Sequence, residues 1–230
     1  MRSREREYLD DHEPEQEVVD RVYRFLALVN RHVGGTRATL GRFERLSQTW
    51  RPGARITVLD VASGMADVPR ALIAWGCERG FDIRVTALDL STRALNSARR
   101  AAPADVHLQF VCGEVGRLPY ADGAYDYVTC ALFFHHLADE EIVAALKAFD
   151  RIAARGIVVN DLVRTRRAYF WIRLFTLPCH PILRNDGPLS VRRALRPNEL
   201  ATLAATTGLP WLSVERHFGH RMTLAGEKID

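Results

Sequence analysis

Residues 56–66 read ITVLDVASGMA, and this stretch decides the fold. The β-branched and aliphatic run 56–61 predicts a buried parallel strand, because a strand covered on both faces is apolar along its whole length. A glycine-containing turn follows over residues 62–66. An apolar helix through Leu72 and Trp75 comes next and ends near Gly80. A strand, a tight turn and a helix in this order form the first half of a βαβ unit.

The same alternation of strand and helix continues to residue 160. We expect further strands over residues 83–88, 106–112, 125–132 and 156–160, and helices over residues 92–101 and 139–152. Ser91 is a favourable N-cap for the helix that starts at Thr92. Strands alternating with helices form a doubly wound, mostly parallel sheet whose strand carboxyl ends face one crevice. The sequence therefore predicts an α/β, Rossmann-like fold.

Segments on either side of this core predict a single domain with additions, in keeping with a length of 230 residues. We expect an N-terminal helical cap (1–52), a cofactor-binding core (53–160), a substrate-covering insert (161–196) and a C-terminal helix and strand pair (197–230). The cap begins with an amphipathic helix around residues 18–29 and continues with a short helix over 39–50. The insert is interpreted as a helix and a loop over the crevice. The strand pair is expected over residues 211–216 and 220–225.

Composition is typical of a soluble globular protein, with 47% hydrophobic and 26% charged residues. The charged start lacks the apolar segment of a secretory signal, and no uninterrupted run of about 18 apolar residues is present. We therefore expect a cytoplasmic protein without integral membrane association. Cys77, Cys112, Cys130 and Cys179 lie far apart, and Cys112 and Cys130 fall in runs interpreted as buried strands. Reduced, packed thiols are expected, with no disulfide and no metal site.

Charge is distributed unevenly along the chain. Residues 1–20 hold eight acids and three arginines, whereas residues 164–196 hold eight arginines and one acid, Asp186. The basic, aromatic insert has several interpretations: an apolar lid over an anionic or phenolic substrate, a dock for an acidic carrier protein, or a solvated arginine face over packed aromatic residues. Binding of nucleic acid is not expected, because no RNA-reading module is present.

Three acids occupy the predicted carboxyl ends of successive strands, namely Asp60, Asp89 and Glu114. A negative rim repels the pyrophosphate of a dinucleotide and stabilises a cofactor that carries sulfonium and ammonium groups. The carboxylate of Asp89 has acceptor oxygens for both hydroxyls of a ribose. The alternative is that these acids are loop residues facing water.

At these positions the chain resembles the class I methyltransferases. The resemblance covers about residues 55–160 and is carried by four motifs in order, at residues 58–64, 87–91, 113–120 and 125–130. It is strongest toward the ubiquinone and menaquinone methyltransferase type. Within that type, Asn30–Gly35 and Val159–Leu162 resemble recurrent segments of a bacterial branch that accompanies polyketide and phenolic-lipid pathways.

This resemblance implies S-adenosylmethionine as cofactor and a small aromatic, quinone or polyketide-type acceptor, methylated at a phenolic oxygen. The acceptor is expected to be a small molecule, free or bound to a carrier protein, and the chain to be a monomer or homodimer. The expected cofactor contacts are Arg31, Asp60, Ala62, Ser63, Gly64, Asp89, Leu90, Gly113, Glu114, Val115 and Ala131. The expected substrate contacts are Asn160, Asp161, Arg164 and His180.

His135 and His136 follow the fourth strand, where the family places substrate and cofactor contacts. A neutral imidazole there can remove a proton from a phenol as the methyl group arrives, and His136 is the first candidate, with His135 second. With an acidic phenol, substrate ionisation and positioning suffice without a base. A further alternative is that the histidines cap a strand and pack. A metal site would need His135, His136, Cys179 and His180 to converge, and none is expected.

The chain departs from the family where Ala62 and Ala66 replace glycines of the usual glycine-rich loop. A methyl group there costs little at negative φ and considerably more in the left-handed region. One alternative is therefore a non-catalytic, cofactor-binding accessory protein. Another is an NAD-dependent oxidoreductase, which NAD would stabilise against heat.

Overall fold

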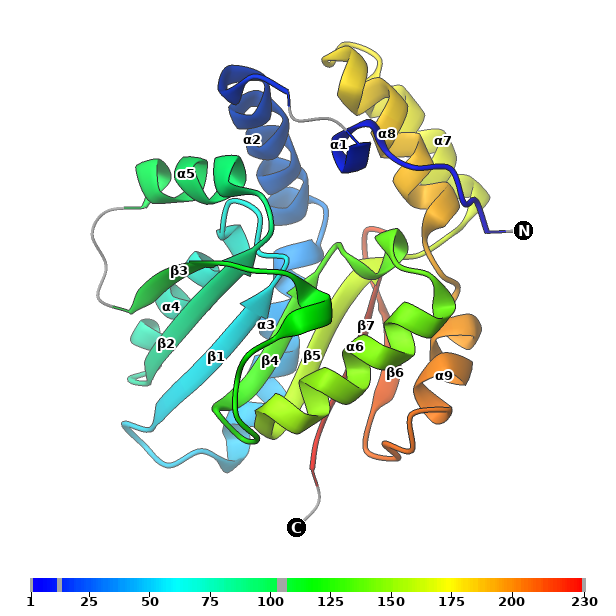
Figure 1. Cartoon of the computed structure of the whole chain (residues 1–230). Coiled ribbons are helices and arrows are strands. Elements are labelled where there is room, and N and C mark those ends of the chain that lie inside the picture. The colour runs from blue at the N-terminus through cyan, green and yellow to red at the C-terminus, as the bar shows by residue number, and fades with distance from the viewer. Residues whose placement is uncertain (1, 12–13, 103–106, 229–230) are drawn as a thin grey trace.

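Seven strands form one sheet in the order β3-β2-β1-β4-β5-β7-β6 in a computed structural model that describes residues 2–11, 14–102 and 107–228 (Figure 1). The strands are β1 (Arg55–Val61), β2 (Asp82–Asp89), β3 (Leu108–Cys112), β4 (Tyr125–Ala131), β5 (Ala153–Leu162), β6 (Ser213–His217) and β7 (Arg221–Glu227). Strands β1 to β5 pair in parallel, and β7 runs antiparallel to β5 and β6. The prediction of a doubly wound, mostly parallel sheet is confirmed. Strand order reverses between β1 and β4, and in open α/β sheets the binding crevice lies at the strand carboxyl ends beside such a reversal.

Helices cover both faces of this sheet. They are α1 (Tyr8–Asp11), α2 (Gln16–His32), α3 (Gly35–Leu46), α4 (Asp67–Glu78), α5 (Thr92–Ala101), α6 (Asp139–Ile152), α7 (Arg166–Thr176), α8 (Pro181–Arg193) and α9 (Pro197–Ala205), with the 3-10 turns η1 (Ser47–Thr49), η2 (Val115–Arg117) and η3 (Phe134–His136). Helices α6 and α9 pack on one face, and α3 and α4 on the other. Helices α1, α2, α7 and α8 lie beyond the carboxyl ends of the strands (Figure 1).

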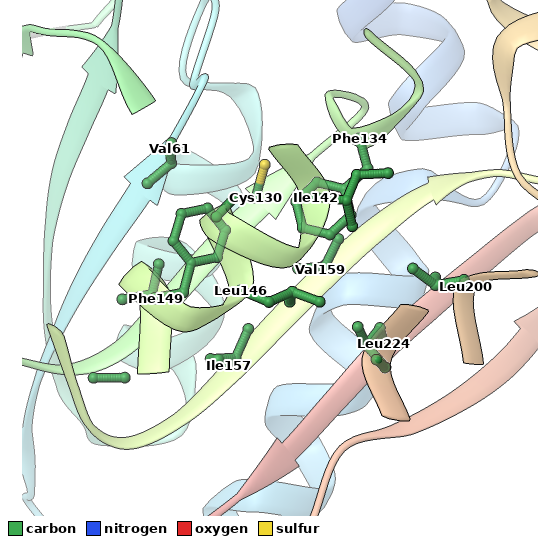
Figure 2. Close-up of a cluster of buried hydrophobic side chains, with 14 of the residues drawn as sticks. Val61, Cys130, Phe134, Ile142, Leu146, Phe149, Ile157, Val159, Leu200 and Leu224 are labelled. Carbon is green, nitrogen blue, oxygen red and sulfur yellow. The ribbon is translucent and has the colours of Figure 1, made fainter. Parts of the chain in front are cut away.

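Each face of the sheet has its own hydrophobic core. Figure 2 shows Leu146 and Phe149 of α6 against Ile157 and Val159 of β5, all four fully or almost fully buried. Burying one such side chain contributes about 1.5–3 kcal/mol relative to leaving it exposed. On the other face, Phe43, Trp50, Trp75 and Tyr127 form edge-on or tilted ring contacts. The core residues of both faces fix the strand ends that carry the polar groups described below.

Two helical segments differ from the sequence prediction. Helix α3 begins at Gly35 and not at residue 39, because Gly34 takes a left-handed conformation (φ 87°) that allows the next helix to start at once. The side chain of Asn30 occupies the space that a Cβ at Gly35 would need. The insert contains two helices where a helix and a loop were expected. In α8, Gly187 lies against Ile172 of α7, and its missing Cβ permits that close helix contact.

The cysteine prediction is correct only in part. Cys77, Cys112, Cys130 and Cys179 are free thiols, and Cys130 is buried. Cys77 and Cys112 are exposed, however, so the prediction of packed thiols is wrong for both; Cys112 is exposed because β3 is an edge strand of the sheet and has no neighbour beyond it among the described residues. The predicted strand start at Val106 lies outside those residues. No helix in the described part of the chain has the length and apolar character needed to cross a membrane.

Candidate active site

The carboxyl end of β1 buries its acid beneath the following loop. Asp60 is 2% exposed, and the hydroxyl of Thr129 on β4 donates to its Oδ1 at 2.6 Å. Burial raises the pKa of Asp60 to about 7, and the charges of Asp67 and Asp89 act in the same direction. Asp60 therefore sits under the crevice floor, within electrostatic range of Asp89, instead of projecting from its rim.

The carboxylate of Asp89, at the end of β2, organises the loop between β1 and α4. The backbone N–H of Gly64 donates to Asp89 Oδ2 at 2.7 Å, and that of Ser91 donates to Oδ1 at 2.8 Å. Ser91 caps α5 as predicted, accepting from the N–H of Ala94. Burial raises the pKa of Asp89, and the hydrogen bonds from Ser91 and Gly64 oppose the rise. Each oxygen of Asp89 retains acceptor capacity beyond these bonds.

Three residues of this loop are left-handed: Ala62 (φ 57°), Gly64 (φ 54°) and Ala66 (φ 54°). Two of them are alanines, whose Cβ atoms meet the following carbonyl in this conformation, at a cost of about 1–2 kcal/mol per residue. The loop therefore keeps the glycine-rich conformation with only one glycine at these three positions.

Tyr23 of α2 lies directly over the loop, a contact that the sequence analysis missed. A Cβ added at Gly64 would meet the Tyr23 ring at 3.0 Å. Burial raises the pKa of the Tyr23 hydroxyl, with contributions from the charges of Asp89 and Asp10. The helical spacing of α2 predicts an inward face but does not tell which strand end that face covers. Tyr23 thus links the Asp89 side of the crevice to the N-terminal segment.

The remaining residues expected to contact a cofactor differ in how deeply they are buried. Ser63 is buried in the loop, and its N–H donates to the carbonyl of Leu88. Glu114 is exposed at the start of η2, so the three acids are not equivalent. Leu90, Gly113, Val115 and Ala131 also follow or end strands, and Leu90 is largely exposed. Arg31 is exposed in the last turn of α2.

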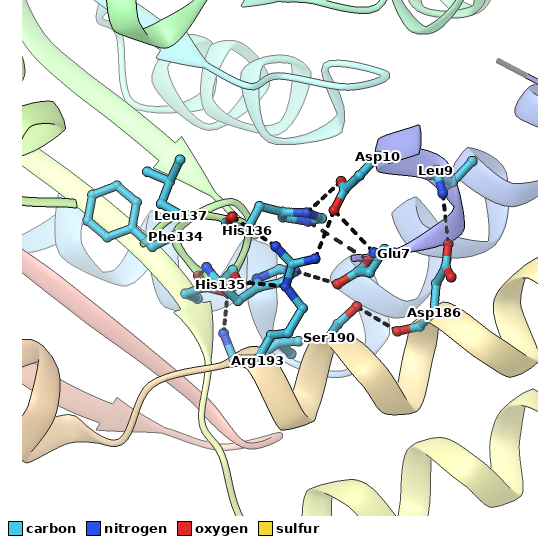
Figure 3. A network of polar contacts seen from close by, with 12 residues as sticks. Glu7, Leu9, Asp10, Phe134, His135, His136, Leu137, Asp186, Ser190 and Arg193 are labelled. Carbon is cyan, nitrogen blue, oxygen red and sulfur yellow. Dashed lines mark hydrogen bonds and ion pairs between the residues drawn. The ribbon is translucent and has the colours of Figure 1, made fainter. Parts of the chain in front are cut away.

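Two histidines and two carboxylates form paired contacts at η3; Figure 3 shows both histidines and Asp10. His135 is 4% exposed. Its ring Nδ1 lies 2.7 Å from Asp161 Oδ1, and its backbone N–H donates to Asp161 Oδ2 at 2.9 Å. Although burial opposes it, the charge and hydrogen bond of His135 lower the pKa of Asp161. His136 Nδ1 lies 2.9 Å from Asp10 Oδ1. Each imidazole therefore has one ring nitrogen on a carboxylate and Nε2 directed elsewhere.

Both Nε2 atoms face Glu7, which is 5% exposed. Glu7 Oε1 lies 3.8 Å from His135 Nε2, and Glu7 Oε2 lies 4.0 Å from His136 Nε2. Glu7 Oε1 has no hydrogen-bond partner within the described residues, and this trio has the spacing to hold a metal ion. Burial raises the pKa of Glu7 to about 7. Near neutral pH a proton can therefore neutralise this buried carboxylate, as a metal ion would.

A strap formed by residues 2–11 covers this group, held by α8. Arg193 donates from Nη1 to Asp10 at 2.8 Å, and from Nε and Nη2 to the carbonyls of His135 and His136. Arg2 donates to the carbonyls of Phe134 and Leu137. Asp186 accepts from the backbone of Tyr8 and Leu9 (Figure 3). Some acids of the acidic start therefore form ion pairs with arginines of the basic insert.

The four expected substrate contacts have different surroundings. Asn160 is fully buried and donates to the carbonyl of Gly35 and to Thr39, so it joins β5 to α3 and offers no surface to an acceptor. This bond also brings together the two segments of the family resemblance, 30–35 and 159–162. Asp161 faces His135, as described. Arg164 pairs with Glu199 of α9. His180 caps α8 and lines a groove of about 510 Å³ beside Tyr8 and Val18.

Arg221 is a second residue that the sequence analysis missed. This β7 side chain is 2% exposed, and its Nε and Nη1 have no hydrogen-bond partner among the described residues. Burial lowers the pKa of Arg221 to about 10, against the opposing effect of Asp161 and Asp67. A cationic donor with unfilled N–H groups therefore lies within electrostatic range of Asp161, the partner of His135, and of Asp67, at the start of α4.

Residues 58–156 match a family described as a methyltransferase domain. This match runs from within β1 to within β5 and includes the loop after β1, Asp89 and both histidines. Over this segment the chain is similar to methyltransferase domains.

Curated relatives agree with this assignment. The chain is 31% identical over 125 residues to a ubiquinone/menaquinone biosynthesis C-methyltransferase of Rickettsia felis, covering 52% of this chain and 49% of the relative. It is 37% identical over 83 residues to a demethylmenaquinone methyltransferase of Deinococcus radiodurans, covering 36% and 33%. The chain thus spans half or less of the length of the curated relatives it matches.

Solved structures share the fold of this chain. Human N-acetylserotonin methyltransferase in complex with S-adenosylmethionine gives a TM-score of 0.68 at 15% identity, over 94% of this chain and 57% of that one. Magnesium protoporphyrin IX methyltransferase from Synechocystis gives 0.58 at 13% identity, over 94% and 100%. At these identities the likeness concerns the fold alone.

Proposed function

We propose that this domain transfers the methyl group of S-adenosylmethionine to a small aromatic acceptor of the quinone or phenol type. The observation that carries the proposal is the Asp89 carboxylate at the end of β2, anchored by the amides of Gly64 and Ser91 at the turn after β1. Asp60 lies buried beside it. Two acids at this position favour a positively charged cofactor and disfavour a pyrophosphate.

The residues present fit this cofactor. Asp89 has free acceptor positions for ribose hydroxyls, and the left-handed loop brings backbone close to the crevice. Tyr23 supplies an aromatic wall over Gly64. The unfilled donors of Arg221 suit a carboxylate or an acceptor oxygen. Bound there, S-adenosylmethionine supplies an electrophilic methyl group.

His135 is the proposed general base, with His136 second. The sequence alone favours His136, but the partner of His135 is better fixed: Asp161 belongs to β5, whereas Asp10 of the His136 pair belongs to the strap. A carboxylate on Nδ1 orients an imidazole and stabilises its protonated form, leaving Nε2 to take a proton. Because Glu7 faces that Nε2, an acceptor reaches His135 only where Glu7 moves aside.

The acceptor class rests on the names of the relatives and on the polar groups of the site. Those names specify ubiquinone, menaquinone and demethylmenaquinone, which favours a quinone-type ring and methylation at carbon. A phenolic oxygen is the second candidate, because a histidine paired with a carboxylate suits removal of a hydroxyl proton. A carrier-bound polyketide acceptor remains part of the same hypothesis.

Replacing Asp89 tests the cofactor assignment. We expect Asp89→Asn to weaken binding of S-adenosylmethionine by about 100-fold, since a neutral amide loses both the charge and one acceptor for the ribose. Isothermal calorimetry measures the affinity. Asp82→Asn is the matched control, because Asp82 lies at the amino end of the same strand, away from the proposed cofactor site, and pairs with Arg55 near the surface. Equal affinities of the two variants would remove Asp89 from the cofactor site.

A product assay tests the reaction. Purified protein, labelled cofactor and separate quinol and phenol acceptors should give a methylated product, whose carbon or oxygen attachment is read by NMR. Cofactor binding without transfer to any acceptor would instead favour the accessory-protein alternative. Heat stabilisation by NAD, and none by S-adenosylmethionine, would favour an oxidoreductase.

A further inference from the structure

Helix α7 carries an exposed apolar face that the candidate active site does not use. Its large exposed side chains, with the residue that follows the helix, are Phe170, Trp171, Leu174, Phe175 and Leu177. Trp171 lies between Phe170 and Phe175 in ring contact with both. Isolated exposed apolar residues are ordinary, whereas a contiguous group of them marks an interaction surface.

The exposed side chains occupy one side of the helix. At 3.6 residues per turn they span roughly 160° of its circumference. The opposite side, with Ala168 and Thr176 buried, packs on α8. Helix α8 in turn lies against α1 and η3, so α7 is the outer helix of the pair (Figure 1). The exposed aromatic residues therefore lie on the side of α7 that faces away from α8.

The charges on α7 are all positive. Arg166 and Arg173 lie along one edge of the apolar face, and Arg167 lies at its amino end. Two of the three arginines of α8 have acidic partners on the strap, Arg192 with Glu5 and Arg193 with Asp10. In the part of the chain that the structure describes, the three arginines of α7 form no ion pair with an acid. The outer helix thus carries three of the insert's arginines that have no acidic partner among the described residues.

We propose that the outer face of α7 docks on the surface of an anionic lipid bilayer. Aromatic and aliphatic side chains enter the boundary between headgroups and acyl chains, while arginines along the edge meet the lipid phosphates. A second copy of this chain fits the face less well, because a two-fold contact would bring the arginines of α7 against their own copies. The inference is independent of the proposed methyl transfer, since docking needs neither cofactor nor acceptor.

Vesicle co-sedimentation tests the apolar part of the proposal. The full chain should bind phosphatidylcholine vesicles that contain phosphatidylglycerol, and Leu174→Ser should bind them several-fold more weakly. Leu28→Ser is the matched control: Leu28 is 56% exposed on α2 and Leu174 is 46% exposed on α7, so the same substitution is made at similar exposure. The double variant Trp171→Ser with Phe175→Ser should lose binding at least tenfold. Thermal unfolding checks that each variant is folded.

Arginine variants test the charge. Each replacement among Arg166→Gln, Arg167→Gln and Arg173→Gln should weaken binding about fivefold and reduce its salt dependence. Arg51→Gln should leave binding unchanged, because Arg51 lies just before β1, at the amino end of that strand and away from α7. Three results would overturn the proposal: no binding of the full chain to anionic vesicles, equal binding of Leu174→Ser and Leu28→Ser, or a dimer in light scattering that Leu174→Ser dissociates while vesicles are not bound.

Discussion

The two sides of the crevice are built in different ways. The Asp89 side consists of consecutive strand ends, and its contacts are short hydrogen bonds from backbone N–H groups to one carboxylate. The histidine side consists of side chains from η3, β5, the strap and α8, joined by charged pairs. One side depends on backbone conformation, and the other depends on segments distant in the chain remaining together.

This difference determines how each side responds to substitution. Breaking a buried ion pair leaves an uncompensated charge, so changes on the histidine side should act strongly on both turnover and strap attachment. The loop after β1 holds its shape through backbone angles, so changes there should act through conformational strain. Variants that separate turnover, strap attachment and loop strain therefore test the comparison directly.

The largest effect is expected for turnover at the histidine pair. His135→Gln should lower turnover by about 100-fold with cofactor affinity nearly unchanged, because glutamine cannot take up a proton. His136→Gln should have a smaller effect, since its partner Asp10 belongs to the strap. Turnover and calorimetric affinity are measured for both variants with one acceptor. Wild-type turnover in both would show that an ionised acceptor reacts without a base.

An effect of comparable size, on stability instead of turnover, is expected at the strap. Arg193→Met should lower the free energy of unfolding by about 3 kcal/mol, because Asp10 loses its buried partner and two carbonyls lose their donor. Arg192→Met is the neighbouring control. Its pair with Glu5 is exposed, so the expected change is below about 1 kcal/mol. Urea unfolding gives both values, and limited proteolysis reports release of the strap. Similar losses in the two variants would contradict the contrast between buried and exposed pairs.

Much of the Asp89 side could be predicted from the sequence because its determinants are local. The apolar run of β1, the N-cap Ser91 and the acid that ends β2 are each visible within a few residues. The left-handed conformation of Ala62 and Ala66 could not be predicted from the sequence, because alanine ordinarily avoids that region and only the surrounding fold imposes it. Exposure of Cys112 was also missed, because a local pattern does not show which strand lies at an edge.

The histidine side could be predicted only as a position after β4. Partners more than a hundred residues away, such as Glu7 and Asp10, leave no periodic pattern in the sequence. Arg221 lies in a strand whose antiparallel pairing with β5 is not encoded locally. The uneven charge of the chain indicates that the acidic start and the basic insert attract each other. It does not show which arginines pair with an acid and which, like those of α7, do not.

The smallest expected effect distinguishes two alanines of the same loop. Replacing Ala62 with glycine removes left-handed strain of about 1–2 kcal/mol, and the greater freedom of glycine in the unfolded chain offsets about 0.4–1 kcal/mol. Ala62 is partly exposed, so the net expectation for Ala62→Gly is a gain of about 0.5–1 kcal/mol. Ala66 is fully buried, and loss of its methyl group costs about 0.8 kcal/mol, which leaves Ala66→Gly close to zero.

Two further substitutions fix the sign of this comparison. Ala74→Gly, at an exposed position of α4, should destabilise by about 1 kcal/mol, as glycine does in a helix interior. Gly64→Ala should destabilise by more than about 1 kcal/mol, because it adds strain at φ 54° and a Cβ against Tyr23. Urea unfolding without cofactor gives all four values. If Ala62→Gly were as destabilising as Ala74→Gly, backbone strain would not govern this loop, and its shape would instead depend on side-chain packing, as the histidine side does.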